Sequence, residues 1–167
     1  MTPAVLVAFA TKHGSTQDVA TEIAGRLCAH GIVTYTCAAA AVDGLEGYDG
    51  VVLGSALYMG RLHADGRNFL RRFRRELAAR PLAVFAMGPR TLADEDVASS
   101  RRQLDAVLAT EPALHPFVSA VFGGVFDPAQ HRFPLNRMRA SDVRDWDAIR
   151  AWADDVADHF AAVEAAA

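Results

Sequence analysis

Residues 11–16 of this sequence have the types and the position needed to hold a phosphate. They follow an apolar run, Val5–Ala10, that has the length of a strand buried on both faces, and a helical pattern begins at Gln17. The N–H groups of a first helical turn lack partners within the helix, and the helix dipole adds partial positive charge there. Gly14 allows an anion to approach the backbone closely, and the hydroxyls of the 11–16 loop are donors. These hydroxyls belong to Thr11, Ser15 and Thr16, and either of the last two is expected to cap the helix.

The elements that must position this loop alternate between buried strands and amphipathic helices. Such an order predicts an α/β fold in one domain over residues 1–167, with a doubly wound, five-stranded parallel sheet in the order 2-1-3-4-5 and helices on both faces. The expected strands are Val5–Ala10, Ile32–Cys37, Gly50–Ser55, Leu82–Met87 and Phe117–Phe126. The expected helices are Gln17–Leu27, a stripe from Phe69 to Leu77, a segment from Asp94 to Leu108, and a last helix from near Asp145, after a long loop at Asp127–Ser141.

In a sheet of this order the ligand crevice lies at the carboxyl ends of strands 1 and 3. Three connections converge there: the 11–16 loop, Ala56–His63 and Gly88–Ala93.

Several phosphate-binding patterns do not fit. The 11–16 loop lacks the Gly-x-x-x-x-Gly-Lys-Ser/Thr spacing of a triphosphate loop and the Gly-x-Gly-x-x-Gly spacing of a dinucleotide site. A phospho-receiver domain needs an acidic pair after strand 1 and an aspartate after strand 3, where this chain has Thr11-Lys12 and Gly54-Ser55.

Composition narrows the class of protein further. The net charge of −3 gives no field that would select nucleic acid. The only lysine is Lys12, and every other basic residue except histidine is arginine. Two cysteines form neither a disulfide framework nor a metal set, and no metal is expected. No apolar run has the ~20 residues of a membrane span, and no signal peptide is recognisable, so we expect a cytoplasmic location.

The sequence resembles the flavodoxin family, whose members carry Ser/Thr-x-Thr-Gly-x-Thr after the first strand. Thr11, Gly14 and Thr16 match this pattern, and His13 stands where a threonine is usual. The resemblance implies a flavodoxin-like fold and flavin mononucleotide (FMN) as the cofactor.

The resemblance also implies a set of cofactor-binding residues. The 11–16 loop would take the phosphate, Ser55–Gly60 would follow the isoalloxazine with Tyr58 stacked on it, and Gly88–Arg90 would close the other side, with Arg90 near the pyrimidine edge. No catalytic residue is identified. The implied cofactor-binding residues are Thr11, Lys12, His13, Gly14, Ser15, Thr16, Ser55, Ala56, Leu57, Tyr58, Met59, Gly60, Gly88, Pro89 and Arg90.

Within the family, the chain looks most like the menaquinone-dependent protoporphyrinogen oxidase branch. The similarity lies in Val51–Gly60, Val121–Val125 and Arg144–Trp152. It implies oxidation of protoporphyrinogen IX with a quinone acceptor in heme biosynthesis, and it allows peripheral contact with a membrane. The long basic insertion of that branch is short here, between Phe126 and Arg139. The arginines and His131 that it keeps are either a surface for a flat anionic substrate or an ordinary solvated loop.

Two alternatives stay open. One is a flavodoxin-type electron carrier with a redox partner, although such carriers are strongly acidic and this chain has an arginine-rich helix face at Arg67–Arg75. That face either binds an acidic partner or is simply solvated. The other alternative is a flavin-free interaction module. The number of subunits is not predicted.

Overall fold

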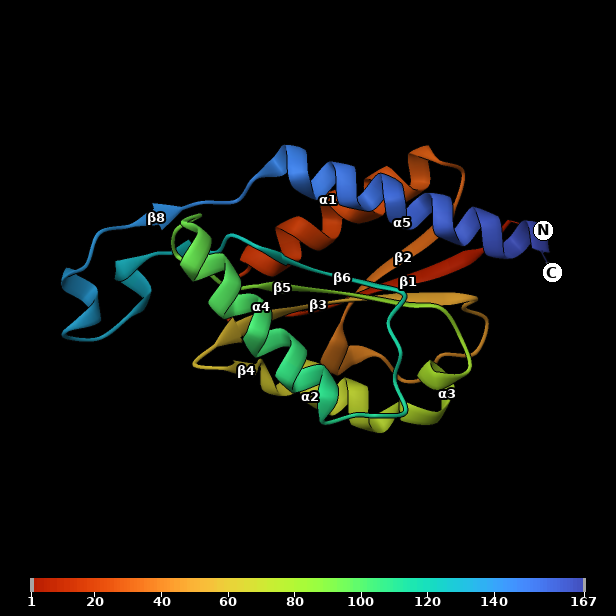
Figure 1. The fold of residues 1–167 in the computed structure, drawn as a ribbon, viewed down its shortest axis with the longest axis horizontal. Helices are drawn as coiled ribbons and strands as arrows, with labels where there is room; N and C mark the ends of the chain where they lie inside the picture. Colours follow the sequence, from red (N-terminus) through yellow and green to blue (C-terminus); the bar gives the residue numbers. More distant parts are fainter. Residues whose placement is uncertain (1, 167) are drawn as a thin grey trace.

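The computed structural model describes residues 2–166, and its centre is one parallel sheet. Five strands lie in the order β2-β1-β3-β5-β6, which confirms the expected order 2-1-3-4-5 once the short β4 is set aside (Figure 1). Neighbouring strands are parallel throughout this path. The strands are β1 (Ala4–Ala10), β2 (Val33–Ala38), β3 (Gly50–Tyr58), β5 (Leu82–Met87) and β6 (Val118–Phe122).

Helices cover both faces of the sheet. In Figure 1, α1 (Ser15–Ala29) and α5 (Trp146–Ala166) lie on one side. The other side carries α2 (Ala64–Arg72), α3 (Arg74–Ala78) and α4 (Asp94–Ala109). The stripe expected to form one helix up to Leu77 is therefore two helices, interrupted at Phe73. One 3-10 turn, Ala39–Ala41, lies in the connection after β2.

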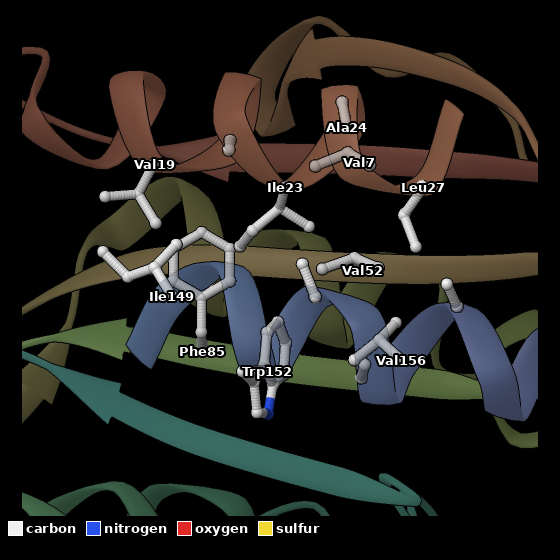
Figure 2. Close-up of a cluster of buried hydrophobic side chains, with 14 of the residues drawn as sticks. Val7, Val19, Ile23, Ala24, Leu27, Val52, Phe85, Ile149, Trp152 and Val156 are labelled. Carbon is white, nitrogen blue, oxygen red and sulfur yellow. The ribbon is translucent and has the colours of Figure 1, made fainter. Parts of the chain in front are cut away.

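The α1/α5 face holds an aromatic core. Figure 2 shows Phe85 and Trp152 among aliphatic side chains of both helices and of strands β1 and β3. The Phe85 and Trp152 ring centroids lie 5.9 Å apart at an edge-on angle, which is a favourable aromatic geometry. Gly54 makes room for this packing, because a Cβ at that position would overlap the Phe85 ring.

On the opposite face, arginine side chains of α2 and α3 hold two connections of the chain, one between β2 and β3 and one after α4. Arg72 donates to the carbonyl oxygens of Val42 and Asp43, both at 3.0 Å. Arg74 pairs with the nearly buried Glu111 at 2.8 Å. Part of the arginine-rich face is thus engaged within the fold and is not simply solvated.

The connection after β3 differs from the expected loop at Ala56–His63. Strand β3 continues to Tyr58 and turns back as β4 (Arg61–Leu62), forming a short hairpin in which Leu57 faces Leu62. Both leucines are buried, and this burial explains why the segment stays extended. The turn uses positive φ at Met59 (49°) and Gly60 (76°), as tight hairpin turns require.

The expected fifth strand, Phe117–Phe126, is also divided. β6 ends at Phe122, and β7 (Val125–Phe126) leaves the sheet to pair antiparallel with β8 (Ser141–Asp142). Gly123 allows this departure, because a Cβ there would overlap the Val143 carbonyl oxygen.

We call residues 125–142 the cover segment. It contains the stretch expected to be a plain loop, which in fact carries 3-10 turns at Pro128–Gln130 and Leu135–Arg137. In Figure 1 the cover segment projects beyond the end of the sheet, around β8.

Candidate functional site

The three connections predicted to converge lie at one edge of the sheet. Ala10, the last residue of β1, is paired with Ser55 of β3, and Ala56 is paired with Met87, the last residue of β5. The 11–16 loop, the β3–β4 hairpin and the segment after β5 therefore start side by side, at the place where an open α/β sheet binds its ligands.

The 11–16 loop is closed by its own residues. The Gly14 N–H donates to the Thr11 hydroxyl oxygen at 3.0 Å, and Gly14 adopts a φ of 91° that favours glycine. Gly14 is the N-cap of α1, in place of the expected Ser15 or Thr16, and no side chain caps the helix. The first-turn N–H groups are consequently left for a ligand.

Thr16 supplies the observation that tests the fit of a phosphate. Its side chain is fully buried, yet within residues 2–166 nothing forms a hydrogen bond with its Oγ1. A buried hydroxyl without a partner is costly, on the order of 1–3 kcal/mol. An anion held at the start of α1 would satisfy it, so this loop fits a phosphate group.

The β3–β4 hairpin offers an exposed aromatic and a buried hydroxyl. Tyr58 is 66% exposed and Met59 is 83% exposed, so a flat ligand can reach both. The buried Ser55 hydroxyl is already engaged within the protein, because it donates to the Ala56 carbonyl oxygen and accepts from the His63 N–H. Contact between Ser55–Gly60 and a flavin stays a prediction, and it now rests on the hairpin's exposed turn.

The segment after β5 is tied to the end of β6. The Gly88 N–H donates to the Phe122 carbonyl oxygen at 3.0 Å, and the Gly124 N–H donates to that of Pro89 at 2.9 Å. The Arg90 guanidinium lies over the Phe126 ring, 4.1 Å from its centroid. Arg90, which we expected at a flavin edge, therefore contacts the cover segment.

The cover segment also reaches the 11–16 loop. Its His131 ring lies edge-on to His13, with 5.4 Å between centroids, and stacks on Phe126 at 4.7 Å. Sequence reasoning missed this contact, since the two histidines are far apart and no spacing rule connects them. Burial and the neighbouring His131 and Lys12 hold the pKa of His13 below its usual value, against an opposing effect of Asp127.

Arg144 anchors the end of the cover segment to the body. It donates to Asp142 at 2.6 Å and to Asp18, in the first turn of α1, at 3.1 Å. Its guanidinium lies 4.9 Å from the Trp146 ring centroid. The hydrogen bonds from Arg144 lower the pKa of Asp142, while burial opposes this effect.

Other kinds of site find less support in the described chain. No cluster of three or more His, Cys, Asp or Glu side chains in residues 2–166 is placed to hold a metal ion. None of the helices described over that range combines the length and apolar content needed to cross a membrane.

Comparison with known proteins gives a consistent result. A family model described as a flavodoxin domain matches residues 6–137. No curated protein sequence matches the chain. Two solved structures that it resembles are oxidised flavodoxins 1 and 2 of Bacillus cereus. The first has a TM-score of 0.64 and 17% identity, covering 93% of this chain and 98% of the other. The second has a TM-score of 0.61 and 21% identity, covering 95% and 97%.

A flavodoxin of Streptococcus pneumoniae is similar to the same degree. Its TM-score is 0.59 at 17% identity, with 95% of this chain and 98% of the other covered. At such identities the structural likeness concerns the fold. None of these comparisons supports the protoporphyrinogen oxidase branch in particular.

Proposed function

The chain belongs to the flavodoxin-domain family, and on that premise we propose that it is an FMN-dependent electron carrier. The family match indicates FMN as the cofactor. The observation that carries the proposal is the uncapped start of α1, where the buried Thr16 hydroxyl has no partner among residues 2–166. The proposal therefore rests on a phosphate site at the same sheet edge as an exposed aromatic.

FMN supplies the redox chemistry, and the chain supplies binding and placement. Thr11 shapes the loop through Gly14, and its hydroxyl hydrogen is left to donate to a phosphate oxygen. Thr16 and the first-turn N–H groups face the same anion. Tyr58, exposed at the end of β3, is the residue suited to stack on the ring.

Exposure of the hairpin favours a carrier. Electron exchange with a partner protein needs the ring edge near the surface, and Tyr58 and Met59 are among the most exposed apolar side chains of the molecule. The arginine-rich face is also a weaker argument against an electron carrier than the sequence alone indicated. Arg72 and Arg74 are engaged with carbonyl groups and Glu111, and so contribute less to a surface that would meet a partner.

The first test is the visible spectrum of the purified protein, alone and after incubation with FMN. We expect flavin absorption that stays with the protein through gel filtration. A protein that remains colourless after incubation overturns the proposal and favours the flavin-free interaction module.

A second test separates a carrier from an enzyme. The reduced flavoprotein should pass electrons rapidly to cytochrome c, a one-electron acceptor, and should not turn over protoporphyrinogen with a menaquinone analogue. Sustained turnover of protoporphyrinogen would instead assign the chain to the oxidase branch and overturn the carrier.

A further inference from the structure

The 11–16 loop departs from the family pattern at His13, and the fold places a second histidine against this departure. His131 comes from the cover segment, and its ring centroid lies 5.4 Å from that of His13. The His131 ring is itself held by stacking on Phe126, over whose ring Arg90 lies. Two imidazoles therefore stand where the family pattern has one threonine hydroxyl.

The charges around this pair favour an anion. Lys12 and the two histidines can carry positive charge, and Asp127 is the acidic group that faces His13. The Asp127 carboxylate also accepts the Ala129 N–H at 2.9 Å. Asp18, in the first turn of α1, and Asp142, at the end of the cover segment, are both paired with Arg144.

We propose that His13 and His131 together bind the phosphate of the cofactor, with the cover segment forming a second wall of the phosphate site. The inference rests on the proposed function. It adds to that function a residue of the cover segment, which lies far beyond the 11–16 loop in the sequence. His131 acts as a binding residue whose placement depends on Phe126.

A pH dependence follows from this arrangement. Without an anion, the neighbouring His131 and Lys12 help to hold the pKa of His13 below its usual value, whereas a phosphate bound beside His13 favours its protonated form. Binding of FMN should therefore take up protons, and its affinity should rise as the pH is lowered from about 8 to about 6.5. Below that range the phosphate itself begins to protonate, since its second pKa is near 6. Riboflavin, which lacks the phosphate, should show no such rise.

The test compares FMN with riboflavin in matched variants of the full chain, using the quenching of flavin fluorescence to measure Kd. His131→Ala should weaken FMN binding about tenfold, the loss expected for one hydrogen bond to a charged group, and leave riboflavin binding unchanged. His131→Gln keeps a donor without the charge, so it should recover part of the affinity at pH 8 and flatten the pH dependence. His115→Ala, at an exposed position before β6, is the control and should behave as the wild type.

A second measurement does not depend on riboflavin affinity. The phosphorus NMR resonance of bound FMN should change its position and its pH titration in His131→Ala and not in His115→Ala. The inference would be overturned if His131→Ala changed neither the FMN affinity nor the phosphorus resonance. It would also be overturned if His131→Ala weakened the binding of FMN and of riboflavin equally. In either case wild-type FMN binding would leave the proposed function standing. A wild-type protein that binds no FMN would remove the proposed function itself.

Discussion

The 11–16 loop and the cover segment meet at one site but are held in different ways. The loop lies between buried residues, with Ala10 before it and the fully buried Thr16 and Val19 at the start of α1. The cover segment has no buried residue between 125 and 142. It is fixed by ring contacts at Phe126 and by the ion pairs of Arg144.

This difference predicts that one part of the site is rigid and that the other part opens independently. Segments with few buried contacts open at a free energy well below that of global unfolding. We therefore expect the 11–16 loop to share the stability of the sheet and the cover segment to open locally. The following predictions test this contrast, beginning with the largest expected effect.

The largest effect should come from the rigid part. The double substitution Thr11→Ala and Thr16→Ala removes the two hydroxyls that we propose bind the phosphate, each worth about 1.5–3 kcal/mol in a charged hydrogen bond. FMN affinity should fall by about a hundredfold or more, as measured by fluorescence titration. Thr21→Ala removes an exposed hydroxyl that, within residues 2–166, donates to the Gln17 carbonyl oxygen, and it is the matched control. Unchanged affinity in the double variant would show that the phosphate binds elsewhere.

The next largest effect concerns the ring contacts that keep the cover segment in place. Phe126→Ala removes both the His131 stacking and the Arg90 contact, together about 1–2.5 kcal/mol. Trypsin should then cleave at the exposed Arg132, Arg137 and Arg139 about ten times faster, with little change in Tm. A large fall in Tm with unchanged cleavage would mean that the cover segment unfolds only with the whole molecule.

A smaller effect should follow the loss of Arg144. Because Asp142 and Asp18 are largely exposed, Arg144→Ala should cost only about 0.5–1 kcal/mol, or a few degrees in Tm.

The stabilisation by Arg144 should also depend on pH. The pKa of Asp142 is lowered in the folded protein. Its contribution is therefore present above the unfolded value of about 3.9 and is lost as the pH falls through the lower folded pKa. Thermal melts of wild type and Arg144→Ala should converge at acid pH. A difference that persists undiminished there would assign the effect to packing on Trp146.

The smallest effect is expected at His13 in the flavin-free protein. Its folded pKa is lowered, so the unfolded chain binds more protons just below pH 6.5, and stability falls slightly as the pH falls through this region. His13→Asn should remove this part of the pH dependence, as measured by Tm between about pH 7.5 and 5. Saturation with FMN should reverse its sign if both histidines bind the phosphate.

The same two regions show how far sequence reasoning reached. Strand order and the placement of the 11–16 loop follow from local patterns, namely buried apolar runs and the Gly14 turn before α1. The cover segment could not be predicted, because its course depends on contacts between distant residues. His131 meets His13, Gly123 leaves room for the Val143 carbonyl group, and Arg144 returns the chain to α1. The β3–β4 hairpin was missed because Gly60 and the polar residues near it are typical of a loop. The feature that makes the segment a hairpin is the pairing of Leu57 with Leu62, which the local sequence pattern does not reveal.

The exposed Lys12 is the only lysine of the sequence, so it is a single position for selective chemical labelling of a lysine side chain. Amine-reactive reagents that modify lysine will find their one lysine target within the 11–16 loop itself. Acylation of Lys12 would place a dye or crosslinker beside the proposed phosphate site without any engineered cysteine. Protection of this amine by FMN would then report occupancy directly by mass spectrometry.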